Sequence, residues 1–342
     1  MTPRYGQADS WSAPRYTGIR TFARLSNVAP ASEGVDAAVI GVPFDTATSM
    51  RPGARFGPAG IRDASLLLRP WHPVHAIDVF ATLSVVDGGD LEVTPGNAER
   101  TAGQIAEQLE PVVRAGVTPI VLGGDHSIVL GELRAHAAVR GPLAVVLLDA
   151  HADTWEAYYG ERYFHGTPFK RALEEGLIDP QRSLLAGMRG SLYDAADLDE
   201  PRAWGFEIVP CDELRTWSPA EYRARVRERV GDGPAYLSFD IDCLDPAFAP
   251  ATGTPEVCGL LPHEAIGFLR ALAGMRFSGF DIVEVAPAYD TAAQTTALVA
   301  ANVAYELLAL AAISASADPS PSGAAGAGAA RGSRSRRRSG TG

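Results

Sequence analysis

Three short segments rich in aspartate and histidine each follow a strand-like apolar run of the chain. They are Gly123–Ser127 (GGDHS), Asp149–Asp153 (DAHAD) and Asp240–Asp242 (DID). Ligands of open parallel sheets bind at the carboxyl ends of the strands, so we expect the three segments to meet at one site. A lone Gly-Gly-Asp also forms ordinary turns, whereas burying all of these ionisable groups without a metal or partners is costly.

Six side chains of these segments are oxygen or imidazole donors that suit metal ions. They are His126, Asp149, His151, Asp153, Asp240 and Asp242. Four carboxylates in one place repel one another and do not all stay ionised unaided. Two divalent cations would neutralise them, and donors without thiolate suit Mn²⁺ better than a structural zinc site. We expect the Asp and His spaced two apart to face one side if the chain stays extended.

Strand-like runs alternate with helical stretches through the middle of the sequence. The strand-like runs are 37–42, 83–86, 119–122, 143–148, 184–188, 235–239 and 280–285. The helical stretches are 58–68, 97–115, 127–139, 168–175, 219–230, 262–273 and 296–312. Ser218, Pro219 and Glu221 form the start signal of one helix, with an N-cap and a capping box. The alternation predicts an α/β fold whose parallel sheet is covered by helices on both faces.

The chain divides into a large domain and two flanking segments of different composition. No repeat or linker interrupts residues 37–313, so we expect one catalytic domain there. Residues 1–36 are mixed and predict an irregular N-terminal arm. Residues 314–342 are almost entirely Ala, Gly, Ser, Pro and Arg. Such a segment cannot bury a core and predicts a disordered tail.

Composition and charge argue against several classes of protein. The net charge is −11, from 30 basic and 41 acidic residues, which disfavours nucleic acid as a partner. Three cysteines without C-x-x-C spacing argue against a thiol zinc site and a disulfide framework. The longest apolar run near the C-terminus, 307–313, is far below the ~20 residues that span a bilayer, and the N-terminus shows no signal peptide. We therefore expect a cytoplasmic protein with no membrane partner.

The order of these motifs resembles the ureohydrolases, the arginase and agmatinase family. The matching motifs are GVPFD at 41–45, RPGARFGP at 51–58, GGDHS, DAHAD, HGTPF at 165–169, SFDIDCLDP at 238–246 and GFDIVEVAP at 279–287. The resemblance covers about residues 37–313. It implies the family's three-layer α/β/α sandwich with a mostly parallel central sheet.

The resemblance also implies two Mn²⁺ ions per subunit. One ion would be held by His126, Asp149, Asp153 and Asp240, and the other by Asp149, His151, Asp240 and Asp242, so that Asp149 and Asp240 bridge. His165 matches the family histidine that serves in proton transfer, and Glu284 matches the carboxylate that grips the guanidinium. Members of the family are commonly trimers or hexamers, so the resemblance implies a homo-oligomer.

The implied reaction is the hydrolysis of a guanidino compound to urea and an amine. A guanidinium is a poor electrophile and water a weak nucleophile, but water between two metal ions loses its proton near neutral pH. Glu284 can accept paired N–H bonds from the planar cation. His165 has a pKa suited to protonating the leaving amine. The complete residue set counts against a non-catalytic metal-binding scaffold.

The loop 154–164 (TWEAYYGERYF) lies between DAHAD and HGTPF and is expected to shape the substrate pocket. Trp155 stands where arginases carry an asparagine that reads the α-carboxylate. Glu156 or Glu161 would meet a substrate ammonium, whereas Arg162 would meet a carboxylate. We favour agmatine, hydrolysed to putrescine and urea in polyamine biosynthesis. The alternatives are 4-guanidinobutyrate, 3-guanidinopropionate and a proclavaminate-type amidinohydrolase substrate.

The remaining histidines and Cys243 match no chemical motif. We expect His72, His75, His136 and His263 at the surface. Cys243 follows Asp242 on the opposite side of an extended chain, so we expect it in the core and not among the metal ligands.

Overall fold

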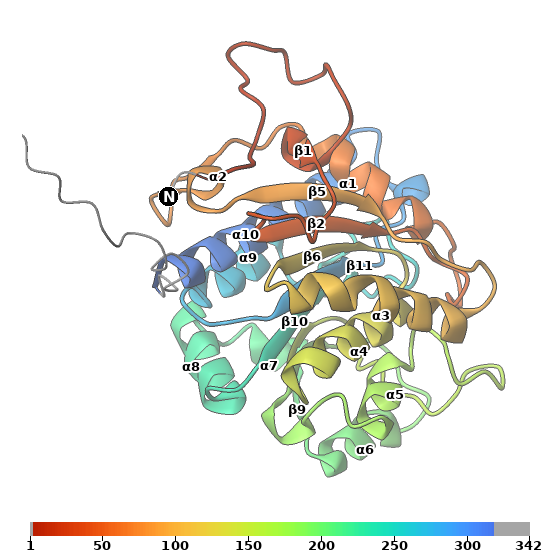
Figure 1. Ribbon diagram of the computed structural model, residues 1–342. Coiled ribbons are helices and arrows are strands. Elements are labelled where there is room, and N and C mark those ends of the chain that lie inside the picture. The colour runs from red at the N-terminus through yellow and green to blue at the C-terminus, as the bar shows by residue number, and fades with distance from the viewer. Residues whose placement is uncertain (1–2, 318–342) are drawn as a thin grey trace, which may run out of the picture.

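The computed structural model describes residues 3–317, and a nine-stranded parallel sheet runs through its centre (Figure 1). The strand order is β1-β5-β2-β6-β11-β10-β7-β8-β9. These strands are β1 (Ser26–Asn27), β2 (Ala37–Val42), β5 (Val85–Asp90), β6 (Thr118–Gly123), β7 (Ala144–Leu148), β8 (Leu184–Met188), β9 (Glu207–Pro210), β10 (Ala235–Asp240) and β11 (Gly279–Val283). A separate antiparallel ribbon pairs β3 (Trp71–His72) with β4 (Ile77–Asp78).

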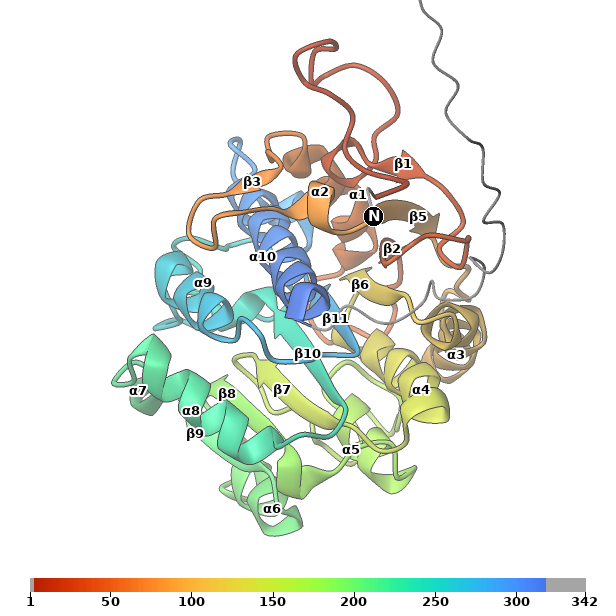
Figure 2. The ribbon, with the colours of Figure 1, turned by 60° about the vertical axis from the view of Figure 1, so that its left-hand side comes forward.

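Helices cover both faces of the sheet (Figure 2). One face carries α1 (Gly57–Ser65), α8 (Pro219–Val230), α9 (Pro262–Ala271) and α10 (Thr295–Ala317). The other carries α3 (Ala98–Arg114), α4 (Val129–Arg140), α5 (Pro168–Glu174) and α6 (Ala196–Trp204). The short helices α2 (Val79–Thr82) and α7 (Cys211–Leu214) complete the set of α-helices in the described chain. The predicted three-layer α/β/α architecture is confirmed.

The strands are apolar on both faces because a helical layer covers each face. In β10, Leu237 packs into the core beneath α8, α9 and α10, whereas Tyr236 packs into the core beneath α4 and α5. Val146 and Val145 of β7 divide in the same way. The predicted capping box is present at the start of α8, where Ser218 and Glu221 exchange hydrogen bonds.

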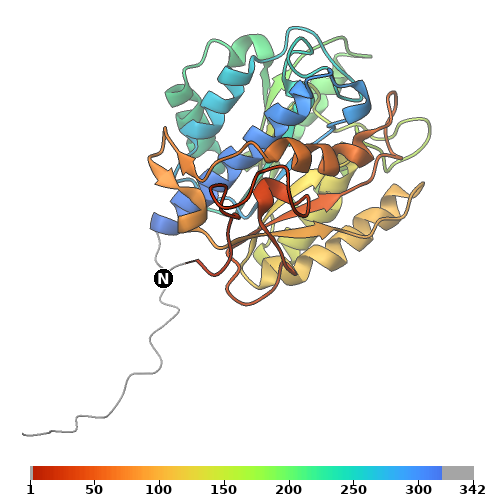
Figure 3. The same cartoon turned by 90° about the horizontal axis from the view of Figure 1, so that it is seen from above.

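Helix α10 is long and apolar enough to cross a membrane by length and composition, with a hydropathy of 1.8 over Thr295–Ser316. However, 72% of that window is buried inside the fold. Seen from above, α10 lies along the sheet beside α1 and α9 (Figure 3). Its apolar surface is therefore used within the core. The helix extends beyond residue 313 to Ala317, and the rest of the predicted tail, 318–342, lies outside the described residues.

The N-terminal arm is irregular but its second half packs against the domain. Phe22 and Ala23 are fully buried. Their backbone N–H groups donate to Asp87 Oδ2 and Ser65 Oγ, each at 2.7 Å. Strand β1 then pairs with β5 at the edge of the sheet. The preceding part of the arm projects as a loop (Figure 1), with Trp11 fully exposed.

Candidate active site

The predicted ligand segments lie at the carboxyl ends of neighbouring central strands. Strand β6 precedes His126, β7 precedes Asp149, and β10 ends at Asp240. Strand β11 lies between β6 and β10 and ends immediately before Glu284. Because all four strands are parallel, their ends bring these side chains to one edge of the sheet.

Nδ1 of His126 lies at the centre of the first group of candidate ligands. It is 2.9 Å from Asp153 Oδ2, 3.1 Å from Asp149 Oδ2 and 3.3 Å from Asp240 Oδ2. The His126 side chain is fully buried. Within residues 3–317, neither Nδ1 nor Asp149 Oδ2 has a conventional hydrogen-bond partner.

The hydrogen-bond chain behind His126 shows which of its nitrogens is free. Nε2 lies 2.9 Å from Ser238 Oγ, and that hydroxyl donates to Asp281 Oδ1 at 2.6 Å. Since the hydroxyl proton is used toward Asp281, Ser238 accepts the Nε2 proton, and Nδ1 presents a lone pair to three carboxylates. Four acceptor atoms that face one point fit a cation.

The pKa shifts in this group also indicate a place for a cation. Burial lowers the pKa of His126, but its interactions with Asp149, Asp153 and Asp240 outweigh burial and raise it well above its ordinary value. The space around Nδ1 therefore favours positive charge. Burial and the nearby Asp242 and Asp149 raise the pKa of Asp240 well above its ordinary value.

A second group of candidate ligands shares Asp149 with the first. His151 Nδ1 lies 3.0 Å from Asp242 Oδ2 and 3.5 Å from Asp149 Oδ1. Asp242 Oδ2 is buried and has no hydrogen-bond partner in the described part of the chain. Burial and the charge of Asp149 raise the pKa of Asp242 to about 6. These features fit a second cation beside the first.

The segments converge by turning and not by staying extended. Asp153 adopts a φ of 50°, and Asp242 belongs to a 3-10 turn at Ile241–Cys243. Glu284 also lies outside the strand, although the sequence predicted a strand over 280–285. It follows β11 with a φ of 63°. Left-handed conformations at non-glycine residues are uncommon and cluster at functional sites.

His165 and Glu284 form a buried pair beside the candidate metal ligands. His165 Nδ1 lies 3.0 Å from Glu284 Oε1, which also accepts the backbone N–H of His126 at 2.8 Å. The other ring nitrogen of His165 accepts the Ser49 N–H at 3.1 Å and lies 2.8 Å from Ser49 Oγ. Burial lowers the pKa of His165, but Glu284 outweighs burial and raises it.

The N-terminal motifs hold the loop that brings Ser49 to His165. The carboxylate of Asp125 accepts the Ala47 N–H at 2.9 Å, and that of Asp45 accepts the Gly53 N–H at 2.7 Å and pairs with Arg55. Gly124 is required because a Cβ there would lie 2.0 Å from the Phe44 carbonyl oxygen.

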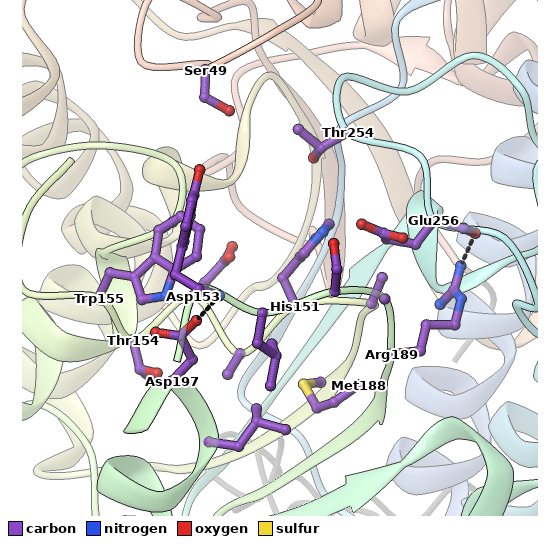
Figure 4. A pocket seen from close by; sticks show the side chains of 18 of the residues that line it. Ser49, His151, Asp153, Thr154, Trp155, Met188, Arg189, Asp197, Thr254 and Glu256 are labelled. Atoms are coloured by element: carbon purple, nitrogen blue, oxygen red, sulfur yellow. Dashed lines mark hydrogen bonds between the residues drawn. The ribbon is translucent and has the colours of Figure 1, made fainter. Parts of the chain in front are cut away.

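A cavity of about 330 Å³ opens above His151 and His165 (Figure 4). Trp155 forms part of its wall and stacks on Tyr158, with ring centroids 5.1 Å apart. The Tyr158 hydroxyl lies 2.7 Å from that of Tyr193, which joins two loops at the cavity. Residues of the wall that sequence reasoning did not identify include Ser49, Thr254, Glu256, Arg189 and Tyr193.

The three predicted charged residues of the loop 154–164 are not among the described residues that line this cavity. The carboxylate of Glu156 pairs with Arg171 at 3.3 Å and with Arg162 at 3.4 Å. Arg162 also pairs with Glu174 of α5 at 2.7 Å. Glu161 is exposed and forms backbone hydrogen bonds with Tyr158. Of the predicted substrate-binding residues, the structure brings Trp155 to the cavity.

Two histidines expected at the surface are buried, and this prediction was wrong for them. His136 is completely buried and His72 is 1% exposed, while His75 is half-buried and His263 is exposed. His72 is accommodated because its Nε2 lies 2.9 Å from Glu306 and its Nδ1 accepts the His75 N–H at 3.2 Å. The Nε2 proton is thus used toward Glu306, which disfavours a third metal site there. Cys243 is fully buried, as predicted.

Comparison with known proteins identifies the family to which this site belongs. The profile described as "Arginase family" matches residues 35–310. The chain belongs to the arginase family. It is 44% identical over 294 residues to the mitochondrial agmatinase of Gallus gallus, covering 86% of each protein. It is 43% identical to the mitochondrial guanidino acid hydrolase of Homo sapiens, covering 86% of this chain and 83% of the human protein.

The fold comparison agrees with the sequence comparison. The solved structure of proclavaminate amidino hydrolase from Streptomyces clavuligerus matches with a TM-score of 0.83 and 41% identity. The match covers 88% of this chain and 100% of that one. This chain and that solved structure therefore share the same fold over most of their lengths.

Proposed function

We propose that this protein hydrolyses a guanidino compound to urea and an amine, and that agmatine is the substrate, giving putrescine. The observation that carries the proposal is the convergence of six ligand-type side chains beside the His165–Glu284 pair, where His151, Asp153 and His165 line one cavity. The relatives named agmatinase and guanidino acid hydrolase support the reaction class.

We propose two Mn²⁺ ions per subunit, held by the six predicted Asp and His ligands. The donor set of carboxylates and imidazoles without thiolate supports manganese. When bound, two divalent cations would hold the buried carboxylates ionised and lower the pKa of water between them. Asp149, which belongs to both candidate groups, supports a bridging role.

Glu284 has one oxygen available to orient a guanidinium. Its Oε1 is used by His126 and His165. Its Oε2 is buried without a hydrogen-bond partner among the residues described. A guanidinium N–H that donates to Oε2 would satisfy this atom and fix the plane of the cation. His165, which lines the cavity, is then placed to pass a proton to the leaving amine.

The proposal is tested by urea release from a panel of guanidino compounds in Mn²⁺. The panel contains agmatine, 4-guanidinobutyrate, 3-guanidinopropionate, arginine and guanidine. Urea from agmatine, lost on chelation and restored by Mn²⁺, supports the proposal, whereas urea from another member alone supports the reaction but overturns agmatine as the substrate. No urea from any member, with metal bound, would contradict it.

The proposal also covers the oligomeric state and the cellular compartment of the protein. We propose a homo-oligomer, a trimer or hexamer, in the cytoplasm. Light scattering of the Mn²⁺-loaded protein tests the oligomeric state, and a monomer would contradict it.

A further inference from the structure

The outer wall of the cavity carries a carboxylate that the proposed reaction does not use. Glu256 lines the cavity, and Figure 4 shows its carboxylate directed toward His151 and the interior. Glu256 forms no ion pair with any residue of the described chain. An unpaired carboxylate that faces a binding cavity is a place for a cationic group of a ligand.

The side chain of Arg189 fixes the backbone around Glu256 by hydrogen bonds. Nη2 of Arg189 donates to the Glu256 carbonyl at 2.7 Å and to the Asp242 carbonyl at 2.6 Å. Nε of Arg189 donates to the Val257 carbonyl at 3.0 Å. This guanidinium therefore clamps the Glu256 loop to the metal-ligand loop, and its N–H groups are used on backbone carbonyls.

Gly190 makes room for the carboxylate. A Cβ at position 190 would lie 2.4 Å from Glu256 Cδ, and the φ of Gly190 is +85°. A side chain at this position would displace the carboxylate from its place. Glycine at 190 thus serves both the turn and the close approach of Glu256.

The charges of the cavity wall favour a cation over an anion. The basic residues that line it are His151, His165 and the clamped Arg189. Two further carboxylates line the cavity, that of the candidate metal ligand Asp153 and that of Asp197, which accepts the Tyr193 N–H at 2.9 Å on the side of Trp155 (Figure 4). A substrate carboxylate beside Glu256 would meet its carboxylate and no uncommitted guanidinium.

A short backbone segment joins Glu256 to the proposed guanidinium site. A Cβ on Gly253 would lie 3.1 Å from Glu284 Oε2, the oxygen proposed to hold the guanidinium. Glu256 follows three residues later, so the Cα atoms of Gly253 and Glu256 are at most about 10 Å apart. Glu256 therefore lies in the neighbourhood of the oxygen proposed to hold the guanidinium.

We infer that Glu256 is the residue that selects the distal charge of the substrate, by binding a primary ammonium. The inference rests on the proposed guanidino hydrolysis and narrows it to substrates that carry a guanidinium at one end and an ammonium at the other. Trp155 and Tyr158 cover the aliphatic part, and Glu256 repels guanidino acids.

Kinetics of Glu256→Gln and Glu256→Lys with agmatine and 4-guanidinobutyrate test the inference. These substrates share the guanidinium but differ in the sign of the distal charge. Glu256→Gln should raise KM for agmatine about 10- to 100-fold, the effect of losing a hydrogen bond to a charged group, and leave kcat nearly unchanged. Glu256→Lys should shift the preference to 4-guanidinobutyrate. Glu213→Gln, at an exposed position of α7, is the matched control.

The outcomes separate the inference from the proposed function. If Glu256→Gln changes agmatine kinetics no more than Glu213→Gln, Glu256 does not select the charge, although hydrolysis stands. If the wild-type protein releases no urea at all, the proposed function fails, and calorimetry with 1,4-diaminobutane still tests the subsite. Weaker binding to Glu256→Gln than to wild type supports an ammonium site, and equal binding overturns it.

Discussion

The Ser238 hydroxyl lies 2.9 Å from Nε2 of His126 and determines which imidazole nitrogen can bind a metal. Its own proton goes to Asp281, which is completely buried. The pair therefore keeps the proton of His126 on Nε2 and its lone pair on Nδ1. Residues that orient a metal ligand in this way commonly affect metal affinity without touching the metal.

Replacing Ser238 with alanine should weaken Mn²⁺ binding about 10- to 100-fold, because His126 loses the acceptor that fixes its tautomer. Equilibrium dialysis followed by metal analysis measures the affinity, and circular dichroism checks the fold. Ser278→Ala is the control, since that hydroxyl donates to the Ala235 carbonyl at 3.0 Å at the other end of the sheet. Unchanged affinity in Ser238→Ala would show that Asp149 and Asp240 alone hold His126 in place.

Asp149 and Asp153 should differ in how many metal ions their loss removes. Asp149 belongs to both candidate groups, whereas Asp153 contacts His126 of the first group. Asp149→Asn should therefore disturb both ions, and Asp153→Asn mainly one. Manganese per chain in the purified variants is the measurement. Full occupancy with normal turnover in Asp149→Asn would refute the two-metal assignment.

The convergence of the candidate metal ligands was predictable from the sequence because these residues stand directly after strands. The ends of adjacent parallel strands meet whatever the loops do, so Asp149 and Asp240 were placed by the fold class alone. The expectation that an extended chain would turn Asp149, His151 and Asp153 to one side was wrong. The φ of 50° at Asp153 shows a turn there. The turn still aims the carboxylate at the same point, only 2.9 Å from His126 Nδ1.

The cavity wall was not predictable, because long-range contacts decide which loop residues reach it. Glu156 and Arg162 are adjacent to the metal segment in sequence, yet their charges are paired with each other and with α5. Glu256 reaches the cavity because Arg189, distant in sequence, binds its carbonyl. His72 was misplaced for the same reason, since its partner Glu306 comes from α10. The short elements α6 and β9 were not predicted, because their sequences show too little apolar periodicity.

His136 should make the fold less stable in mild acid. It is completely buried, and burial together with Arg140 lowers its pKa from 6.5 to about 3. Between these values the unfolded chain binds a proton that the folded chain does not, so stability falls as the pH drops below 6.5. At pH 5 the loss should be about 2 kcal/mol relative to neutral pH.

Denaturant unfolding of wild type and His136→Gln at pH 7.5 and 5.0 measures this effect. The variant should lose less stability between the two pH values, because its side chain does not titrate. Burial raises the pKa of Glu132 and of Asp281 in both proteins, so the comparison isolates His136. His263→Gln, at an exposed position, should behave as wild type. Equal pH dependence in all three proteins would mean that His136 is protonated in the fold or titrates unperturbed.

His165 should affect turnover and leave the metal site intact. Its nitrogens contact Glu284 and Ser49, and the metal-ligand groups do not include it. The raised pKa of His165, which Glu284 sustains against burial, keeps a proton available near neutral pH. His165→Ala should therefore retain both ions and bind substrate nearly normally, while kcat falls by about 10²- to 10⁴-fold, the range for a general acid. Added imidazole should restore part of the rate, because His165 lines the cavity and its removal leaves space there. Steady-state kinetics with metal analysis of the same samples decides the role. Loss of manganese in proportion to activity would make His165 a support of the metal site, and an unchanged kcat would mean that another group protonates the amine.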